Sequence, residues 1–272
     1  MNLKDYSEMA LEFMENGQEN LVSASDALRD EVSGLKMYEA PIFGAASAGD
    51  SLFKRLKEEG IVGSHHRLPE EWLQEAQTVI SFFAPFTLPV RKSNSRNMIW
   101  PSDEWLHARI EGQKFLNLLL QYLKAETEKF GYLCVIPSQS QLFKSDDQKK
   151  HTSNWSERHV AHICGLGTFS LSKGLITEKG VAGRFGSLVT NLKIKPEKER
   201  PYSQYDEYCT YCGACIDNCP AKAINLREGK KHEPCCDYIN FIRKKEAPRY
   251  GCGKCQVSVP CEDQIPADVR NR

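Results

Sequence analysis

The chain has 272 residues, in which 36 Lys and Arg balance 36 Asp and Glu, so no global field favours nucleic acid or an anionic membrane. No apolar run approaches the roughly 18 residues that span a bilayer. The polar, acidic start of the chain lacks the apolar region of a secretion signal. We therefore expect a cytoplasmic protein without a membrane segment, long enough for one large domain and one small one.

Four short apolar runs predict strands, because they are rich in β-branched and aromatic residues and are flanked by turn or polar residues. The two clearer runs are residues 78–83 and 133–136. Residues 41–46 and 186–192 are weaker candidates.

Two helices are predicted among these strands. Residues 69–77 carry Pro and Glu in what would be the first turn of a short helix. Residues 102–130 predict a longer helix, with Ser102 or Asp103 as its N-cap. Its apolar face is formed by leucines at helical spacing, namely Leu116, Leu119, Leu120 and Leu123. Helices interleaved with strands predict an α+β fold whose main domain is an α/β-like layered sheet.

The cysteines divide the chain at about residue 200. Cys134 and Cys164 are the only two of the eleven cysteines that precede this point. The stretch 193–201 is charged and bounded by proline, which is typical of a surface connection. We therefore expect an α/β cofactor- or substrate-binding domain over residues 1–200. A small two-cluster ferredoxin-like domain should follow over residues 201–272.

The run Cys209-x2-Cys212-x2-Cys215-x3-Cys219-Pro220 has the spacing that ligates [4Fe–4S] clusters in bacterial ferredoxins. In that pattern the fourth cysteine serves the other cluster, so two clusters are predicted. A disulfide framework and a four-cysteine zinc site are the two alternatives. The length of the chain and its odd number of cysteines disfavour disulfides, and the crowding of four thiolates disfavours zinc.

A second motif, Cys252-x2-Cys255-x5-Cys261, supplies the remaining ligands. Interleaving assigns Cys209, Cys212, Cys215 and Cys261 to cluster one. Cluster two then takes Cys219, Cys252, Cys255 and one thiolate of the adjacent pair Cys235–Cys236. We favour Cys235, because the following residues to Tyr238 and Phe241 would form an apolar helix face.

A glycine-rich stretch in residues 153–190 brackets Phe169 and Arg184 and predicts a ligand-facing surface. It contains neither of the two glycine motifs that bind dinucleotides or nucleotide phosphates. Two cubanes relay single electrons, so the large domain should hold the electron acceptor.

Three further motifs stand around these features: a strand ending in Ala84-Pro85-Phe86, the run Glu157-Arg158-x5-Cys164-Gly165-Leu166-Gly167-x-Phe169, and Tyr250-Gly251-Cys252-x2-Cys255-Gln256. Together with the double cluster motif they resemble the epoxyqueuosine reductases, which are related to corrinoid-dependent reductive dehalogenases. The resemblance implies a cobalamin between the two domains and an external donor of ferredoxin or flavodoxin type. It places the cobalamin contacts at Ser153, Gly165, Leu166, Gly167, Phe169, Arg184, Gly186 and Ser187.

His151 stands where that family has an aspartate taken as the proton donor, so the resemblance makes His151 the predicted catalytic acid. We expect an iron–sulfur reductase acting on a small molecule. One alternative is an electron-transfer or activation protein for a redox partner. The other is the tRNA epoxyqueuosine reductase itself, although zero net charge disfavours RNA.

Overall fold

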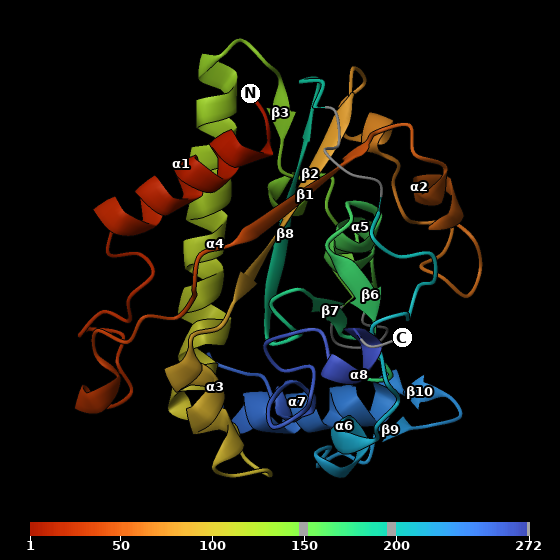
Figure 1. The fold of residues 1–272 in the computed structure, drawn as a ribbon. Coiled ribbons are helices and arrows are strands. Elements are labelled where there is room, and N and C mark those ends of the chain that lie inside the picture. The colour runs from red at the N-terminus through yellow and green to blue at the C-terminus, as the bar shows by residue number, and fades with distance from the viewer. Residues whose placement is uncertain (147–151, 195–199, 271–272) are drawn as a thin grey trace.

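A four-stranded sheet forms the centre of the computed structural model, which describes residues 1–146, 152–194 and 200–270 (Figure 1). In spatial order its strands are β1 (Ile42–Ser47), β2 (Thr78–Pro85), β8 (Gly183–Thr190) and β3 (Cys134–Val135). All neighbouring strands are antiparallel. Every predicted strand is present, but β8 begins at Gly183 because its first residues pair with the end of β2.

Helices cover both faces of this sheet (Figure 1). On one face, α1 (Leu3–Asn16) and α4 (Asp103–Lys129) share a core with Ile80 and Phe82 of β2. On the other face, α2 (Ser51–Arg55) and α5 (Glu157–Ile163) pack with Val79. Strand β2 is thus buried along its whole length, which explains its continuous apolar sequence.

Helix α4 has the predicted N-cap and apolar face. The side chain of Ser102 accepts a 3.2 Å hydrogen bond from the backbone N–H of Trp105. The four leucines of the predicted face are at most 2% exposed. Burial of this face against the sheet is what holds a helix of 27 residues in place.

The predicted helix over residues 69–77 is wrong. The structure contains a single 3-10 turn, η2 (Pro69–Glu71). The Glu71 carboxylate folds back and accepts a 2.6 Å hydrogen bond from the backbone N–H of Leu68, which closes the turn. Trp72 then packs edge-on against Trp155, so tertiary packing overrides the helix signal.

Shorter elements complete the chain. Those before residue 200 are η1 (Asp30–Val32), α3 (Leu88–Ser95), η3 (Pro137–Gln139), β4 (Ser145–Asp146), β5 (Thr152–Ser153), β6 (Gly167–Phe169) and β7 (Leu175–Thr177). Those after it are α6 (Ala214–Asp217), β9 (Ile224–Asn225), β10 (Gly229–Lys230), α7 (His232–Glu246), η4 (Lys254–Gln256) and α8 (Ala267–Arg270). No helix in the described ranges is both long and apolar enough to cross a membrane.

The C-terminal segment, residues 200–270, packs beneath the sheet against α3 and α4 (Figure 1). Arg91 of α3 forms ion pairs of 2.7 and 2.9 Å with Glu262 and Asp263. The backbone N–H of Val181 donates to the carbonyl of Cys261 at 2.9 Å. The expected connection near residue 200 falls largely on residues 195–199, outside the described residues, and the domain boundary stays a prediction.

Candidate metal centres and cofactor cavity

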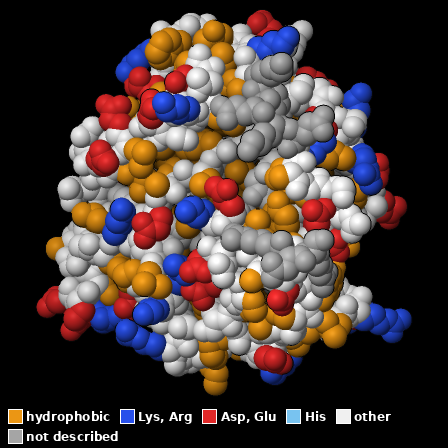
Figure 2. All heavy atoms as spheres, in the orientation of Figure 1, with side chains coloured by type: hydrophobic (Ala, Val, Ile, Leu, Met, Phe, Trp, Pro, Cys, Tyr) orange, Lys and Arg blue, Asp and Glu red, His pale blue; other side chains and the backbone are white. Residues whose placement is uncertain are grey.

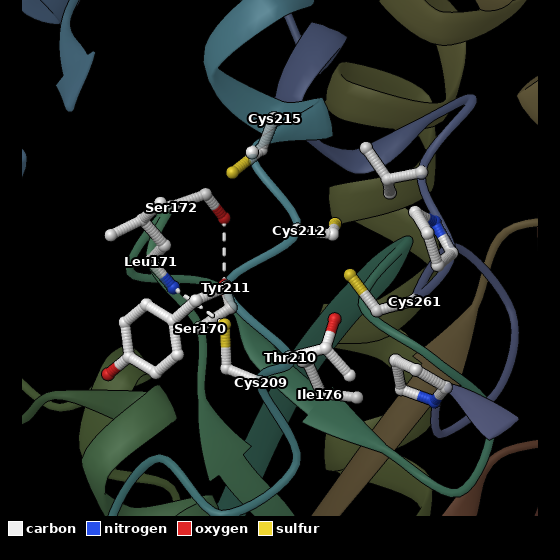
Figure 3. A pocket seen from close by; sticks show the side chains of 14 residues that line it. Ser170, Leu171, Ser172, Ile176, Cys209, Thr210, Tyr211, Cys212, Cys215 and Cys261 are labelled. Carbon is white, nitrogen blue, oxygen red and sulfur yellow. Dashed lines mark hydrogen bonds between the residues drawn. The ribbon is translucent and has the colours of Figure 1, made fainter. Parts of the chain in front are cut away.

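The four cysteines assigned to cluster one surround a common space. Cys209, Cys212, Cys215 and Cys261 line the same small pocket, and Figure 3 shows their sulfurs around its interior. The backbone N–H of Leu171 donates to Cys209 Sγ at 3.4 Å. Hydrogen bonds of this kind to cluster sulfurs are one of the ways in which proteins tune reduction potentials.

Left-handed backbone lets the loop of the first motif wrap around this pocket. Tyr211 has a φ of 54° and Gly213 a φ of 82°, on either side of Cys212. An added Cβ on Gly213 would meet open space, so the glycine is favoured there by backbone conformation alone. Helix α6 then begins and carries Cys215.

The cysteines assigned to cluster two form an adjacent group. Cys219, Cys235 and Cys255 pack in one apolar cluster, together with Cys209 and Cys215 of the first set. Burial raises the pKa of Cys252 to about 12, and the nearby thiols of Cys255 and Cys235 add to this rise. A metal cluster would relieve this penalty, because metal binding takes the thiols in their ionised form.

The two neighbouring cysteines of α7 have different surroundings. Cys235 lies among the other thiols of the second set. Cys236 is 3% exposed and accepts a 3.5 Å hydrogen bond from the Asn240 side chain on the same helix. The structure thus places Cys235, and not Cys236, beside the other second-set cysteines.

The cysteines of the first set are arranged around a small pocket. Within residues 1–146, 152–194 and 200–270, no three His, Cys, Asp or Glu side chains are placed to hold a single metal ion. A tetrahedral zinc site gathers four ligands about 2.0–2.3 Å from one ion.

A cavity of about 2000 Å³ separates the sheet domain from the cluster segment. Its wall includes Trp105 and Arg109 of α4, residues of α5, and Cys252 of the second cysteine set. Ser153, Phe169 and Arg184 also line it, as the resemblance predicted for a cofactor site. The cavity therefore connects these residues with the second set.

The other five predicted cofactor contacts do not line the cavity in the structure. Gly165 ends α5 with a φ of 85°, and Leu166 is buried in a small core. A Cβ on Gly167 would lie 2.0 Å from the carbonyl oxygen of Ile176, so this glycine permits β6 and β7 to pair.

Gly186 and Ser187 lie within β8. A Cβ on Gly186 would lie 2.6 Å from the ring of Phe82. The Ser187 hydroxyl is buried and hydrogen-bonds to Trp155 and Glu157. The predicted acid His151 lies outside the described residues, so its place is not part of this geometry.

Several wall residues escaped the sequence prediction. Arg109 donates a 2.7 Å hydrogen bond to the Tyr250 hydroxyl, and its guanidinium lies 4.5 Å from the ring centre. Arg243 covers the ring at 4.2 Å. Trp105, Arg109 and Gln113 recur at intervals of four on α4, beside its leucine face, and that spacing was the available signal.

Buried cationic and neutral groups dominate the electrostatics of the wall. Arg184 donates a 2.6 Å hydrogen bond to Gln113. Burial lowers the pKa of Arg158, whose guanidinium donates to the Lys173 carbonyl. Burial, reinforced by Arg158, lowers the pKa of His159 to about 3, so this imidazole is neutral at physiological pH.

Three acidic residues, Glu157, Asp206 and Glu228, also line the cavity, and Glu157 is the one with a buried carboxyl oxygen that lacks a partner among the described residues. Glu157 Oε2 accepts a 2.7 Å hydrogen bond from the Ser187 hydroxyl. Glu157 Oε1 is buried and has no partner among the described residues. Burial raises the pKa of Glu157 to about 7, although Ser187 and Arg184 partly oppose the rise.

Comparisons with known proteins agree with this geometry. The model of the 4Fe-4S binding domain matches residues 204–225. Epoxyqueuosine reductase of Lactococcus garvieae is 34% identical over 113 residues, which are 37% of this chain and 30% of that protein. Over this part of its length the chain is similar to the epoxyqueuosine reductases. The curated reductases that it matches align over only about a third of their own length.

Solved structures show the same fold. Epoxyqueuosine reductase from Streptococcus thermophilus matches with a TM-score of 0.50 and 20% identity, over 97% of this chain and 68% of that one. A reductive dehalogenase, whose structure was interpreted as suggesting a mechanism for B12-dependent dehalogenation, matches with a TM-score of 0.53 and 16% identity. That match covers 85% of this chain and 31% of the dehalogenase.

Proposed function

We propose that this protein is an iron–sulfur oxidoreductase of the epoxyqueuosine reductase type. It would pass low-potential electrons through two [4Fe–4S] clusters to a corrinoid held in the large cavity. One observation carries the proposal: a ligand of the second cysteine set, Cys252, forms part of the cavity wall.

The exposure of the cysteines gives the relay a direction. Cys212, in the first set, is the exposed cysteine among the eight assigned ligands. Cys215 and Cys255 lie close enough for their thiols to influence each other electrostatically, so the two sets are neighbours. An external donor would therefore deliver electrons at the first cluster, and the second would release them toward the cavity.

The cavity fits a corrinoid in size and chemistry. Its volume of about 2000 Å³ exceeds the roughly 300–1,000 Å³ typical of small-ligand pockets. Ser153, Phe169 and Arg184 would hold the cofactor. The hydrogen-bonded pair Arg109 and Tyr250 also lines the cavity. When bound, a low-valent corrinoid supplies the reducing power for the substrate. The reductive dehalogenase with the same fold is described as B12-dependent.

The tRNA epoxyqueuosine reductase reaction is the second candidate. Six arginines line the cavity and concentrate positive charge there, in a chain of zero net charge, namely Arg55, Arg109, Arg158, Arg184, Arg200 and Arg227. A phosphate-bearing substrate would find complementary charge there. The relative from Lactococcus garvieae carries the name of this activity. A mere electron-transfer protein would need no cavity of this size.

The test uses the full chain, reconstituted anaerobically with iron and sulfide. Hydroxocobalamin is titrated into the protein, and binding is followed by its visible absorbance. Arg184→Gln is the site variant, and Arg96→Gln, an exposed arginine that is not among the residues lining the cavity, is the control. Saturable binding that weakens in Arg184→Gln supports the corrinoid site. Absence of binding, with about eight irons present, overturns it. An epoxyqueuosine-containing tRNA stem loop and a small halogenated phenol then distinguish the two substrate classes.

A further inference from the structure

The two oxygens of the Glu157 carboxyl group have different environments. Oε2 is held by the Ser187 hydroxyl at 2.7 Å. Oε1 is buried and has no hydrogen-bond partner in the described part of the chain, and Glu157 is one of the residues that line the cavity. A buried carboxylate oxygen without a partner is costly, so this position favours either a proton or a donor from a bound molecule.

The direction of the hydrogen bonds determines which oxygen carries the proton. Trp155 Nε1 donates a 2.8 Å hydrogen bond to Ser187 Oγ. The single proton of the Ser187 hydroxyl is then free to point at Glu157 Oε2. Because Oε2 is already an acceptor, a protonated Glu157 carries its hydrogen on Oε1.

The Trp155 ring is rigidly placed, so this arrangement is preorganised. It stacks on Phe53 with ring centres 6.2 Å apart and on His66 at 5.6 Å. The Trp155 side chain is 1% exposed. Ser187 lies in the middle of the sheet, paired with Ser81. Neither Trp155 nor Ser187 can rotate away from its hydrogen-bond partner without disrupting the core.

Burial and the neighbouring charges together bring the pKa of the Glu157 carboxyl group close to physiological pH. Burial is the main cause of its raised pKa, and Arg184 of β8 partly opposes it. The Arg184 guanidinium is also engaged by Gln113 of α4. Cys164, at the end of α5, feels the Glu157 charge, and burial keeps that thiol protonated. Glu157 is therefore present in both protonation states near pH 7.

We propose that Glu157 is the acid that delivers a proton to the molecule reduced in the cavity. The proposal deepens the function above and rests on it. The external donor supplies two electrons through the clusters. The O–H bond at Oε1 breaks as a bond forms between that hydrogen and the substrate atom gaining electron density. With an epoxide, both carbon–oxygen bonds break and the oxygen leaves as water, so solvent provides a second proton. With a halogenated substrate, the carbon–halogen bond breaks, halide leaves, and one proton is sufficient. Solvent then reprotonates the carboxylate.

The first test measures the protonation state of the Glu157 carboxyl group directly and needs no cobalamin. Infrared difference spectra of the reconstituted protein are recorded between pH 5.5 and 8.5. The wild type should show a protonated carboxyl band that disappears with a midpoint near 7. Glu157→Gln should lack it, while the control Glu228→Gln should keep it. Glu228 also lines the cavity but pairs with Lys231 at the surface. A spectrum without such a band overturns the proposal.

The second test reads the reaction. Cobalamin-loaded protein is reduced chemically and given an epoxyqueuosine-containing tRNA stem loop or a halogenated phenol. Rates that fall above pH 7 in the wild type, and are about 100-fold lower and independent of pH in Glu157→Gln, support the proposal. His151→Gln serves as comparison, and a pH profile abolished by that change but kept in Glu157→Gln overturns it.

Failure of the two proposals can be separated. A titrating Glu157 band in a protein that binds no cobalamin refutes the proposed function and, with it, this role for the proton. A protein that binds cobalamin and turns over equally well in Glu157→Gln refutes the acid role alone. Iron content and cobalamin affinity of Glu157→Gln must match the wild type, which confirms that the variant is folded.

Discussion

The ammonium group of Lys254 donates a 2.7 Å hydrogen bond to Oδ1 of Asn94, and a second one of 2.6 Å to its backbone carbonyl. Lys254 stands between Cys252 and Cys255 and has no exposed surface. The Asn94 side chain in turn donates to the carbonyl of Cys252 at 3.0 Å. Helix α3 thus holds the second cysteine motif through one buried cation.

Replacing this cation should lower the reduction potential of the second cluster. Burial lowers the pKa of Lys254 to about 8, so the side chain remains mostly charged at pH 7 and favours the more negative, reduced cluster. Loss of about 1.4 kcal/mol of this attraction in Lys254→Met corresponds to about 59 mV for one electron. Redox titration followed by electron paramagnetic resonance measures it. Lys244→Met, on the exposed face of α7, should leave both potentials unchanged.

Gly253→Ala should release the second cluster. A Cβ at this position would lie 1.9 Å from the Trp105 ring, and the residue has a φ of 69°. Gly213→Ala is the matched control, because Gly213 has a φ of 82° but open space around it. The control should lose only about 1 kcal/mol of stability from backbone strain. Thermal unfolding and iron content are compared, and equal losses in both variants would contradict the steric explanation.

The two adjacent cysteines of α7 should respond differently to substitution. Cys235→Ser should remove about half of the roughly eight irons, because it deletes one ligand of the second set. Cys236→Ala should keep all the iron and lose about 1–2 kcal/mol of stability, since it truncates a buried side chain. Iron and sulfide analysis after anaerobic reconstitution decides between them. Half the iron in Cys236→Ala would reverse the assignment.

Glu157 should make the stability of the protein depend on pH. Its pKa is raised to about 7, so the folded protein binds a proton more tightly than the unfolded chain does. This contribution is complete at pH 4 and is lost as the pH rises to 7, by up to about 3 kcal/mol. Relative to wild type, Glu157→Gln should therefore gain stability between pH 5 and 8. Thermal midpoints measure this gain, and Glu228→Gln should show none.

Local sequence patterns were sufficient to predict much of the fold. The strand β2 and the leucine face of α4 are continuous apolar signals, and both are buried in the structure. The helix expected over residues 69–77 ends after one 3-10 turn, where Trp72 packs against Trp155. That contact joins residues far apart in sequence, and no local pattern contains it.

The cysteine motifs carried most of the information about the site, because ligand spacing is a local property. The cavity wall was harder to predict. Arg109 and Tyr250 meet only because α4 and the C-terminal segment pack together. Glu157 of α5 is important because it is buried and contacts Ser187 of β8, and sequence spacing encodes neither property. Gly167 and Gly186, which were predicted to face a ligand, instead allow β6, β7 and β8 to pack closely against their neighbours.

The close contact of Gly253 with Trp105 connects the binding site of the second cluster with the wall of the large cavity. Tyr250, Gly251 and Gly253 belong to the wall of the cavity and also to the loop that presents Cys252. A molecule whose second cluster is destroyed by oxygen loses the anchor of this loop. We therefore expect that loss of the second cluster would loosen this part of the cavity wall as well as interrupt electron transfer.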